Sequence, residues 1–205
     1  MTAEVFVVPM AASDVRDLAR LHREAFPGFF LSTLGEPFLV QFYRGFLQDD
    51  TAVSVVARDG HGMPLGAVVG TTEPAGFFGR LLKHRWPGFA LASAQAVLRN
   101  PSAASRLVRA VRYRGEAPAG EDGALLSSIC VDPAAQGGGI GRLLVDEWTR
   151  VAAAKGAKGA FLTTDAIGND AVNGFYRSGG WKLTDSYQTS EGRSMQRYTK
   201  RLEAR

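Results

Sequence analysis

The glycine-rich run 136–142, Gln-Gly-Gly-Gly-Ile-Gly-Arg, is the part of the chain best suited to do chemistry. It follows an apolar stretch that predicts a buried strand over 125–131 and precedes an amphipathic stretch that predicts a helix over 142–154. Glycine lets backbone N–H groups approach an anion, and the start of a helix adds a partial positive charge. The run therefore predicts a site for a phosphate-bearing ligand.

Two familiar phosphate-binding patterns fit this run poorly. A P-loop needs Gly-Lys-Ser/Thr, whereas Arg142 and Leu143 follow Gly141 here. A dinucleotide fold would use Asp165, after the next predicted strand, to bind a ribose, but its glycines should follow the first strand directly. Here the segment 131–136 intervenes. A loop that uses glycine only for turning is a third explanation, and it leaves the helix that follows unexplained.

A second motif supports a different interpretation of the phosphate site. Asn169 stands seven residues before Tyr176 in a predicted short helix over 170–177, and Gly179-Gly180-Trp181 follows. With Val131-Asp132-Pro133 and Gln136-x-x-Gly139-x-Gly141 ahead of it, this order resembles the GNAT superfamily of N-acetyltransferases. The superfamily carries Gln/Arg-x-x-Gly-x-Gly/Ala after its central strand. The resemblance covers about residues 124–187 directly.

The resemblance implies acetyl-CoA as co-substrate, held by the strand before the loop, by the loop and by the short helix. The cofactor-binding residues that it implies are Ile129, Cys130, Val131, Gln136, Gly137, Gly138, Gly139, Ile140, Gly141, Arg142, Asn169, Asn173 and Tyr176. Structural explanations stay open for several of them: a helix-start residue for Arg142, a helix cap for Asn169 and a small packed side chain for Cys130.

Tyr176 is the expected general acid. A phenol is protonated at neutral pH and can donate to the departing thiolate. The alternative is a tyrosine packed between helix and sheet. The resemblance implies that many relatives use a glutamate on the central strand as the general base. Here the run 125–129, Leu-Leu-Ser-Ser-Ile, has no carboxylate.

His22, Glu73 and Asp165 are the remaining candidates for the general base. We favour His22 because an imidazole titrates near neutral pH. It also precedes the aromatic stretch 25–30, in the region that shapes the acceptor pocket in this superfamily. Solvated surface positions are the alternative for all three.

A basic segment over about 74–122 separates the third predicted strand from the fourth, where the superfamily usually has a few residues. No Asp or Glu occurs from Pro74 to Gly115. The eight cations there are Arg80, Lys83, Arg85, Arg99, Arg106, Arg109, Arg112 and Arg114. The rest of the chain holds 16 basic and 20 acidic residues, so the positive balance is local. The segment is either a solvated helical cap or an electrostatic funnel for an anionic acceptor.

The order of predicted elements gives the fold class. The predicted strands are 5–8, 52–57, 65–71, 125–131, 160–164, 181–187 and 194–199, and the predicted helices are 14–25, 34–47, 142–154 and 170–177. We expect one α/β domain over 1–205 with a helical insertion between the third and fourth strands. The resemblance implies the GNAT fold, a mixed and mostly antiparallel twisted sheet flanked by helices and splayed where acetyl-CoA enters.

Composition limits the remaining possibilities. A hydrophobic fraction of 45% and a charged fraction of 21% are ordinary for a globular protein. We expect no signal peptide, no membrane span, no nucleic-acid partner and a cytoplasmic location. The single cysteine, Cys130, excludes an intrachain disulfide, and with three scattered histidines it offers no metal-ligand spacing. A homodimer is compatible with the sequence.

These observations predict an N-acetyltransferase that moves an acetyl group directly from acetyl-CoA to a primary amine. The run 22–35 is similar to that of GNAT proteins of amino-sugar and polysaccharide pathways, so a small anionic acceptor such as an amino-sugar nucleotide is expected. The bulky rings of Phe29, Phe30 and Trp86 favour a closed pocket over an open groove. The alternatives are a protein N-terminal or lysine acetyltransferase and a non-catalytic CoA-binding module.

Overall fold

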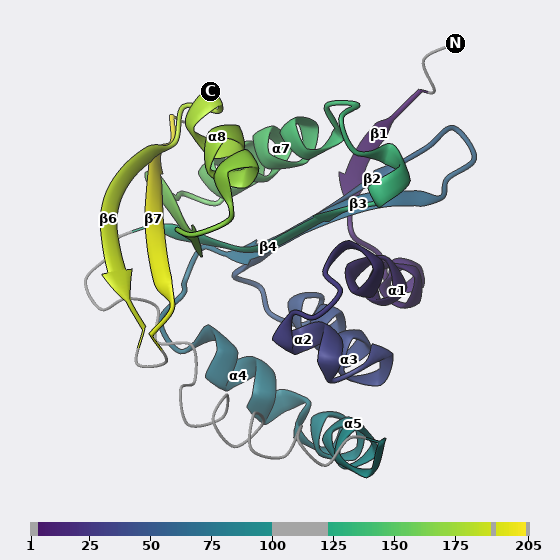
Figure 1. Cartoon of the computed structure of the whole chain (residues 1–205). Coiled ribbons are helices and arrows are strands. Elements are labelled where there is room, and N and C mark those ends of the chain that lie inside the picture. The colour runs from purple at the N-terminus through teal and green to yellow at the C-terminus, as the bar shows by residue number, and fades with distance from the viewer. Residues whose placement is uncertain (1–3, 100–122, 190–191, 204–205) are drawn as a thin grey trace.

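The computed structural model describes residues 4–99, 123–189 and 192–203, and a seven-stranded sheet forms its centre (Figure 1). The strand order is β1-β2-β3-β4-β5-β7-β6, and every neighbouring pair is antiparallel except β4 and β5. The strands are β1 (Phe6–Pro9), β2 (Ala52–Arg58), β3 (Pro64–Thr71), β4 (Ala124–Val131), β5 (Gly159–Asp165), β6 (Lys182–Gln188) and β7 (Ser194–Arg201). This confirms the predicted mixed, mostly antiparallel sheet.

Helices cover both faces of the sheet (Figure 1). One layer holds α1 (Val15–Ala25), α2 (Phe30–Thr33), α3 (Glu36–Phe46), α4 (Phe77–His84) and α5 (Trp86–Arg99). The other layer holds α7 (Ile140–Ala154) and α8 (Asp170–Ser178). The single helix predicted over 34–47 is wrong at its start: Gly35, with φ of 87°, separates α2 from α3. That left-handed conformation suits glycine and interrupts a right-handed helix.

The period-two pattern of the strands divides the apolar core between the two faces. In β2, Val56 packs into the cluster that contains Leu18 and Phe42 of α1 and α3. Its neighbour Val55 packs into the opposite cluster, with Trp148 of α7. Each fully buried apolar side chain of this size contributes about 1.5–3 kcal/mol. The sheet is therefore fixed between two helical layers.

Strands β4 and β5 diverge after a short contact. They pair only at Ala124↔Ala160 and Leu125↔Phe161. On its other edge, β4 stays paired with β3 as far as Val131, with a register shift opposite Val69 and Gly70. Among the described residues, the edge of β4 that faces β5 is therefore unpaired from residue 126 to 131, as the family resemblance implied.

The basic insertion begins as two helices packed on α3. Phe77 of α4 and Phe89 of α5 are buried in the same cluster as Phe38 and Phe46 of α3. The first part of the insertion is therefore helical, as predicted. Residues 100–122, which include Arg106, Arg109, Arg112 and Arg114, lie outside the described residues. In the part of the chain that is described, no helix combines the length and apolarity needed to cross a membrane.

Candidate active site

The loop before α7 presents backbone donors. Gly137 and Gly139 have φ of 83° and 81°, which places both in the left-handed region that favours glycine. The five N–H groups from Gly137 to Gly141 have no acceptor within the described residues. Because they stand at the start of a 15-residue helix, they form a site suited to an anion.

The strand that leads to this loop contributes backbone groups, while its side chains belong mainly to the core. The Cys130 side chain is buried against the α1–α3 layer, and burial raises the pKa of its thiol to about 11. Ile129 packs against the opposite cluster. The carbonyl of Val131 accepts a hydrogen bond from Gln136 Nε2 at 3.3 Å, which ties the loop back to the end of the strand.

Arg142 and Ile140 face away from the phosphate loop. The Arg142 guanidinium donates to the carbonyl of Phe175 at 3.2 Å and to Ser178 Oγ at 2.8 Å, and it lies over the Phe175 ring. A cation at the C-terminus of α8 is favoured by the helix dipole. These contacts tie α7 to α8, and phosphate binding by the Arg142 side chain stays a prediction. The Ile140 side chain is buried in the core.

The two asparagines of the second motif differ in their surroundings. Asn173 is buried, accepts a hydrogen bond from Thr164 Oγ1 at 2.5 Å and donates to the Asp165 carbonyl at 3.1 Å. Its side chain therefore ties α8 to the end of β5, and its part in cofactor binding stays a prediction. Asn169 precedes α8 without making a side-chain cap, so its amide remains available.

Tyr176 combines burial with a free hydroxyl. Its ring is 3% exposed and packs edge-on against Phe175 and Trp181. Burial raises the pKa of its phenol, which keeps the group protonated at neutral pH. Among the described residues, no hydrogen-bond partner reaches its hydroxyl, so this proton remains available for donation.

His22 does not have the properties predicted for a neutral-pH base. It is 3% exposed, and its Nδ1 lies 3.0 Å from the hydroxyl of Tyr43, which in turn lies 3.5 Å from Cys130 Sγ. Burial lowers the pKa of the imidazole to about 4. The ring is therefore neutral at pH 7 and its surroundings oppose protonation. No sequence pattern marked Tyr43 as part of this chain of contacts, because its spacing on α3 is that of an ordinary core residue.

Asp165 is also engaged inside the protein. Both of its carboxylate oxygens accept hydrogen bonds from Arg193, at 2.7 and 2.8 Å. This bidentate pair bridges the end of β5 and the start of β7. The Asp165 carboxylate therefore has a structural role in joining these two segments.

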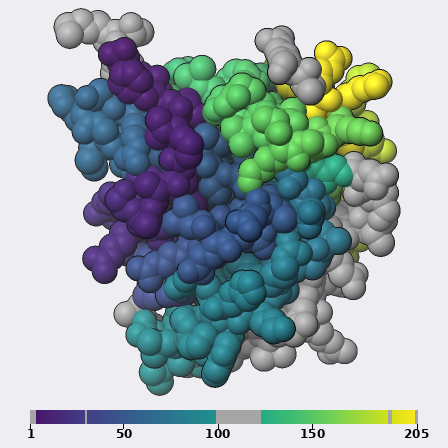
Figure 2. All heavy atoms as spheres, turned by 180° about the vertical axis from the view of Figure 1, so that it is seen from behind, coloured from purple at the N-terminus to yellow at the C-terminus, as the bar shows by residue number. Residues whose placement is uncertain are grey.

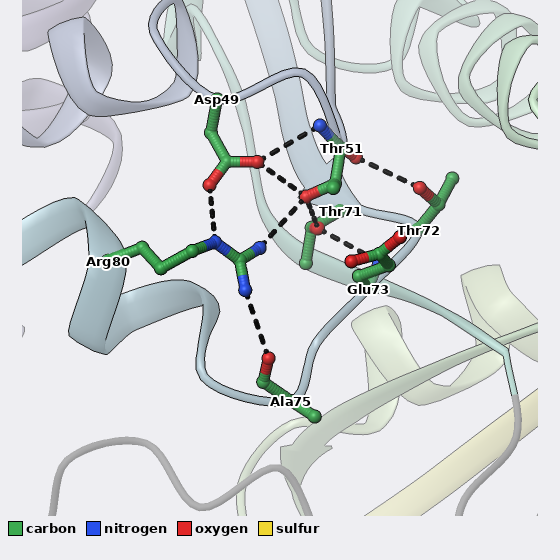
Figure 3. Close-up of polar contacts among 7 residues, drawn as sticks. All are labelled: Asp49, Thr51, Thr71, Thr72, Glu73, Ala75 and Arg80. Carbon is green, nitrogen blue, oxygen red and sulfur yellow. Dashed lines mark hydrogen bonds and ion pairs between the residues drawn. The ribbon is translucent and has the colours of Figure 1, made fainter.

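Glu73 is the candidate base whose carboxylate is unpaired (Figure 3). It is exposed just beyond the end of β3, and among the described residues no hydrogen bond or ion pair reaches its side chain. Its backbone N–H donates to Thr71 Oγ1 at 3.1 Å. Thr71 pairs with Leu125, the last residue at which β4 contacts β5. Glu73 therefore lies at the closed end of the β4–β5 opening.

Arg80 of α4 holds the loop that carries Glu73. Its Nε donates to Asp49 at 2.9 Å and its Nη2 to Thr51 Oγ1 at 3.2 Å, while Nη1 donates to the Ala75 carbonyl at 3.2 Å (Figure 3). The Thr51 and Thr71 hydroxyls are 2.8 Å apart and complete the network. Spacing alone could not have predicted it, since 31 residues separate Asp49 from Arg80.

The described cations of the insertion contribute unequally to the predicted funnel. Arg80 is engaged as above, and Arg85 donates to Gln41 and Gln48 of the α3 region at 2.9 and 2.8 Å. Lys83 is exposed. Of the rings expected to close a pocket, Phe29 and Trp86 are on the surface, 52% and 66% exposed. Within the described ranges, no cluster of three metal-ligating side chains occurs.

Comparison with known proteins agrees with this geometry. Residues 102–183 match the family model described as an acetyltransferase (GNAT) domain. A GNAT-family protein from Desulfovibrio desulfuricans shares the fold with a TM-score of 0.64 at 16% identity, over 98% of this chain and all of that one. Comparison with curated protein sequences gives no match.

Two further solved structures share the fold. The ribosomal-protein-S18-alanine N-acetyltransferase from Escherichia coli has a TM-score of 0.56 at 15% identity, over 98% of this chain and 96% of that one. A spermidine N-acetyltransferase chimera from Vibrio cholerae has a TM-score of 0.61 at 13% identity, over 97% and 96%. At these identities the likeness establishes the fold.

Proposed function

We propose that this chain is an acetyl-CoA-dependent acyltransferase of the GNAT superfamily and that it acetylates a small primary amine by direct transfer. The observation that carries the proposal is that an unpaired strand edge leads to a loop of free backbone N–H groups. The unpaired edge of β4 runs from residue 126 to 131, and the free N–H groups of residues 137–141 stand where that edge ends. An extended thioester arm fits the first feature, and a pyrophosphate fits the second.

Each chemical role has a candidate in the chain. The amine nitrogen attacks the thioester carbonyl, a C–N bond forms and the C–S bond breaks. Tyr176 gives its hydroxyl proton to the departing sulfur. Glu73 accepts the proton that the amine loses, through water. The products are the acetamide and the free thiol, and Tyr176 regains its proton from solvent.

The acceptor is proposed as a small primary amine. The fold neighbours include proteins named for acetylation of a ribosomal-protein alanine and of spermidine, so the fold serves both peptide and polyamine acceptors. An amino-sugar nucleotide remains the anionic class that the sequence suggested. Because Arg80 is engaged with Asp49 and Arg85 with Gln41, we expect an anionic acceptor to be held by other cations.

Thiol release from acetyl-CoA, measured against a panel of amines, tests this function. The panel contains an amino-sugar nucleotide, a polyamine and short peptides, and mass spectrometry of the product identifies the acetylated nitrogen. We expect turnover with at least one small amine. Tight acetyl-CoA binding without transfer to any amine would instead support a non-catalytic CoA-binding module.

A further inference from the structure

Helix α5 is apolar on two opposite sides. No charged residue occurs from Trp86 to Leu98. One side of the helix is buried: Phe89 and Ala92 belong to the core cluster that contains α3, and Ala96 is also buried. The other side is exposed, and residues separated by three or four positions lie along it. We name this side the α5 outer face; its residues are Trp86, Pro87, Ala90, Leu91, Ala94 and Leu98.

The α5 outer face exposes large side chains to an unusual degree. Trp86, Leu91 and Leu98 are 66%, 63% and 85% exposed. A helix that is apolar all round is normally buried, and a contiguous exposed apolar surface usually marks an interaction site. The face extends over 13 residues, or about 18 Å at the helical rise. This length exceeds what a small acceptor would cover.

Positive charge without acidic partners borders this face. Lys83 at the end of α4 and Arg44 on α3 are exposed, and neither has an ion pair within the described residues. Arg85 lies close enough to Arg44 that burial and then this neighbouring charge lower its pKa. The chain from Pro74 to Gly115, which includes Lys83 and Arg85, contains no acid, and Asp49 is paired with Arg80. The surface near the start of α5 is therefore complementary to anions.

We propose that the α5 outer face docks on an anionic phospholipid surface, with Trp86, Leu91 and Leu98 entering the headgroup region and Lys83 and Arg44 facing lipid phosphates. Exposed apolar residues that include a tryptophan, bordered by cations, are the combination that binds such surfaces. A second copy fits less well, because a twofold contact through this face would bring like charges together.

The position of α5 keeps the candidate active site open during docking. Helices α4 and α5 form one end of the molecule, while the glycine loop and α7 lie on the other side of the sheet (Figure 1). The same end is visible from behind, where the teal residues of α4 and α5 lie at the bottom of the view (Figure 2). Docking would therefore bring the enzyme to a membrane without covering its phosphate loop.

The tryptophans provide a direct test. Trp148 and Trp181 are buried, so Trp86 is the exposed indole of the three in the chain. We expect vesicles with anionic phospholipid to shift the emission of the full-length protein to shorter wavelength and to protect it from a soluble quencher. Neutral phosphatidylcholine vesicles should bind at least tenfold more weakly. Trp86→Phe should remove the spectral change.

Paired variants distinguish binding through the α5 outer face from non-specific hydrophobic binding. Leu91→Gln/Leu98→Gln should lower co-sedimentation with anionic vesicles at least tenfold, and Arg44→Glu with Lys83→Glu should do the same without touching the apolar stripe. Ile167→Gln/Leu183→Gln, which changes exposed apolar residues elsewhere, should bind as the wild type does. Circular dichroism confirms that each variant is folded.

Three results would overturn the proposal. They are equal binding to anionic and neutral vesicles, unchanged sedimentation of the Leu91→Gln/Leu98→Gln variant, and no sedimentation of the wild type. Light scattering adds a fourth: a wild-type dimer that becomes a monomer in that variant would assign the face to a second copy. Saturable capture of an acidic protein without vesicle binding would assign it to a protein partner.

Discussion

Polar groups at the β4–β5 opening lack hydrogen-bond partners within the described parts of the chain, whereas those buried in the α1–α3 layer have them. At the opening, backbone N–H groups at residues 137–141 and the hydroxyl of Tyr176 have no partner among the described residues. In the helical layer, His22, Tyr43 and Cys130 form a closed buried chain with distances of 3.0 and 3.5 Å. Both regions contain residues that could do chemistry in isolation.

The difference shows that availability, rather than residue type, separates a functional group from a structural one. A buried polar group must be satisfied inside the protein or it destabilises the fold. A group left without an internal partner at the edge of an opening can be satisfied by a ligand. His22 falls on the structural side of this division, and Tyr176 and Glu73 fall on the other.

Two buried tyrosines test this division most strongly. Tyr176→Phe should lower kcat about 100-fold or more, the size of a lost general acid, with little change in acetyl-CoA affinity. Tyr43→Phe should leave kcat within about twofold of wild type and lower the free energy of unfolding by about 1–2 kcal/mol, because it breaks a buried hydrogen-bond chain. Steady-state kinetics and urea unfolding measure both. Reversed outcomes would break the comparison.

Glu73 should show the next largest effect. Glu73→Gln should lower kcat about tenfold to 100-fold, because an amide cannot accept the proton that the amine loses. Glu24→Gln, a change at another exposed carboxylate, serves as the control and should leave kcat unchanged. A kcat of Glu73→Gln that matches the wild type would remove Glu73 from the mechanism.

The glycine loop should show a smaller effect, on binding. Gly139→Ala places a side chain at φ of 81° and should weaken acetyl-CoA binding about tenfold by disturbing the N–H groups. Gly156→Ala, at φ of 93° after α7, introduces the same kind of backbone strain. Neither position has an atom within 4 Å of the added Cβ, so crowding does not distinguish them. Equal losses of affinity would indicate a general effect on stability.

His22 should affect stability and leave turnover almost unchanged. Its folded-state pKa is lowered to about 4 from 6.5, so the unfolded chain binds more protons between these values. Stability should therefore be complete above about pH 6.5 and should fall as the pH drops toward 4, by at most about 3 kcal/mol. His22→Asn, which can retain the bond to Tyr43, should unfold with a flatter pH dependence. An unchanged dependence would contradict the burial argument.

Local sequence patterns were enough to predict most of the fold and part of the candidate site. The residues within each run predicted the positions of all seven strands, because the tendency to form a strand is largely local. The Gly137–Gly141 loop was predictable because backbone conformation is encoded locally by glycine. The partners of Arg142, His22 and Asp165 were not, because each lies on another element and only the folded chain brings them together.

Calorimetric titration with acetyl-CoA and, in parallel, NAD tests the central claim most directly. The claim is that the unpaired β4 edge and the glycine loop form an acetyl-CoA site. The account predicts micromolar binding of acetyl-CoA, weaker binding by Gly139→Ala than by Gly156→Ala, and no binding of NAD. Absence of acetyl-CoA binding by the folded wild-type protein would contradict the claim.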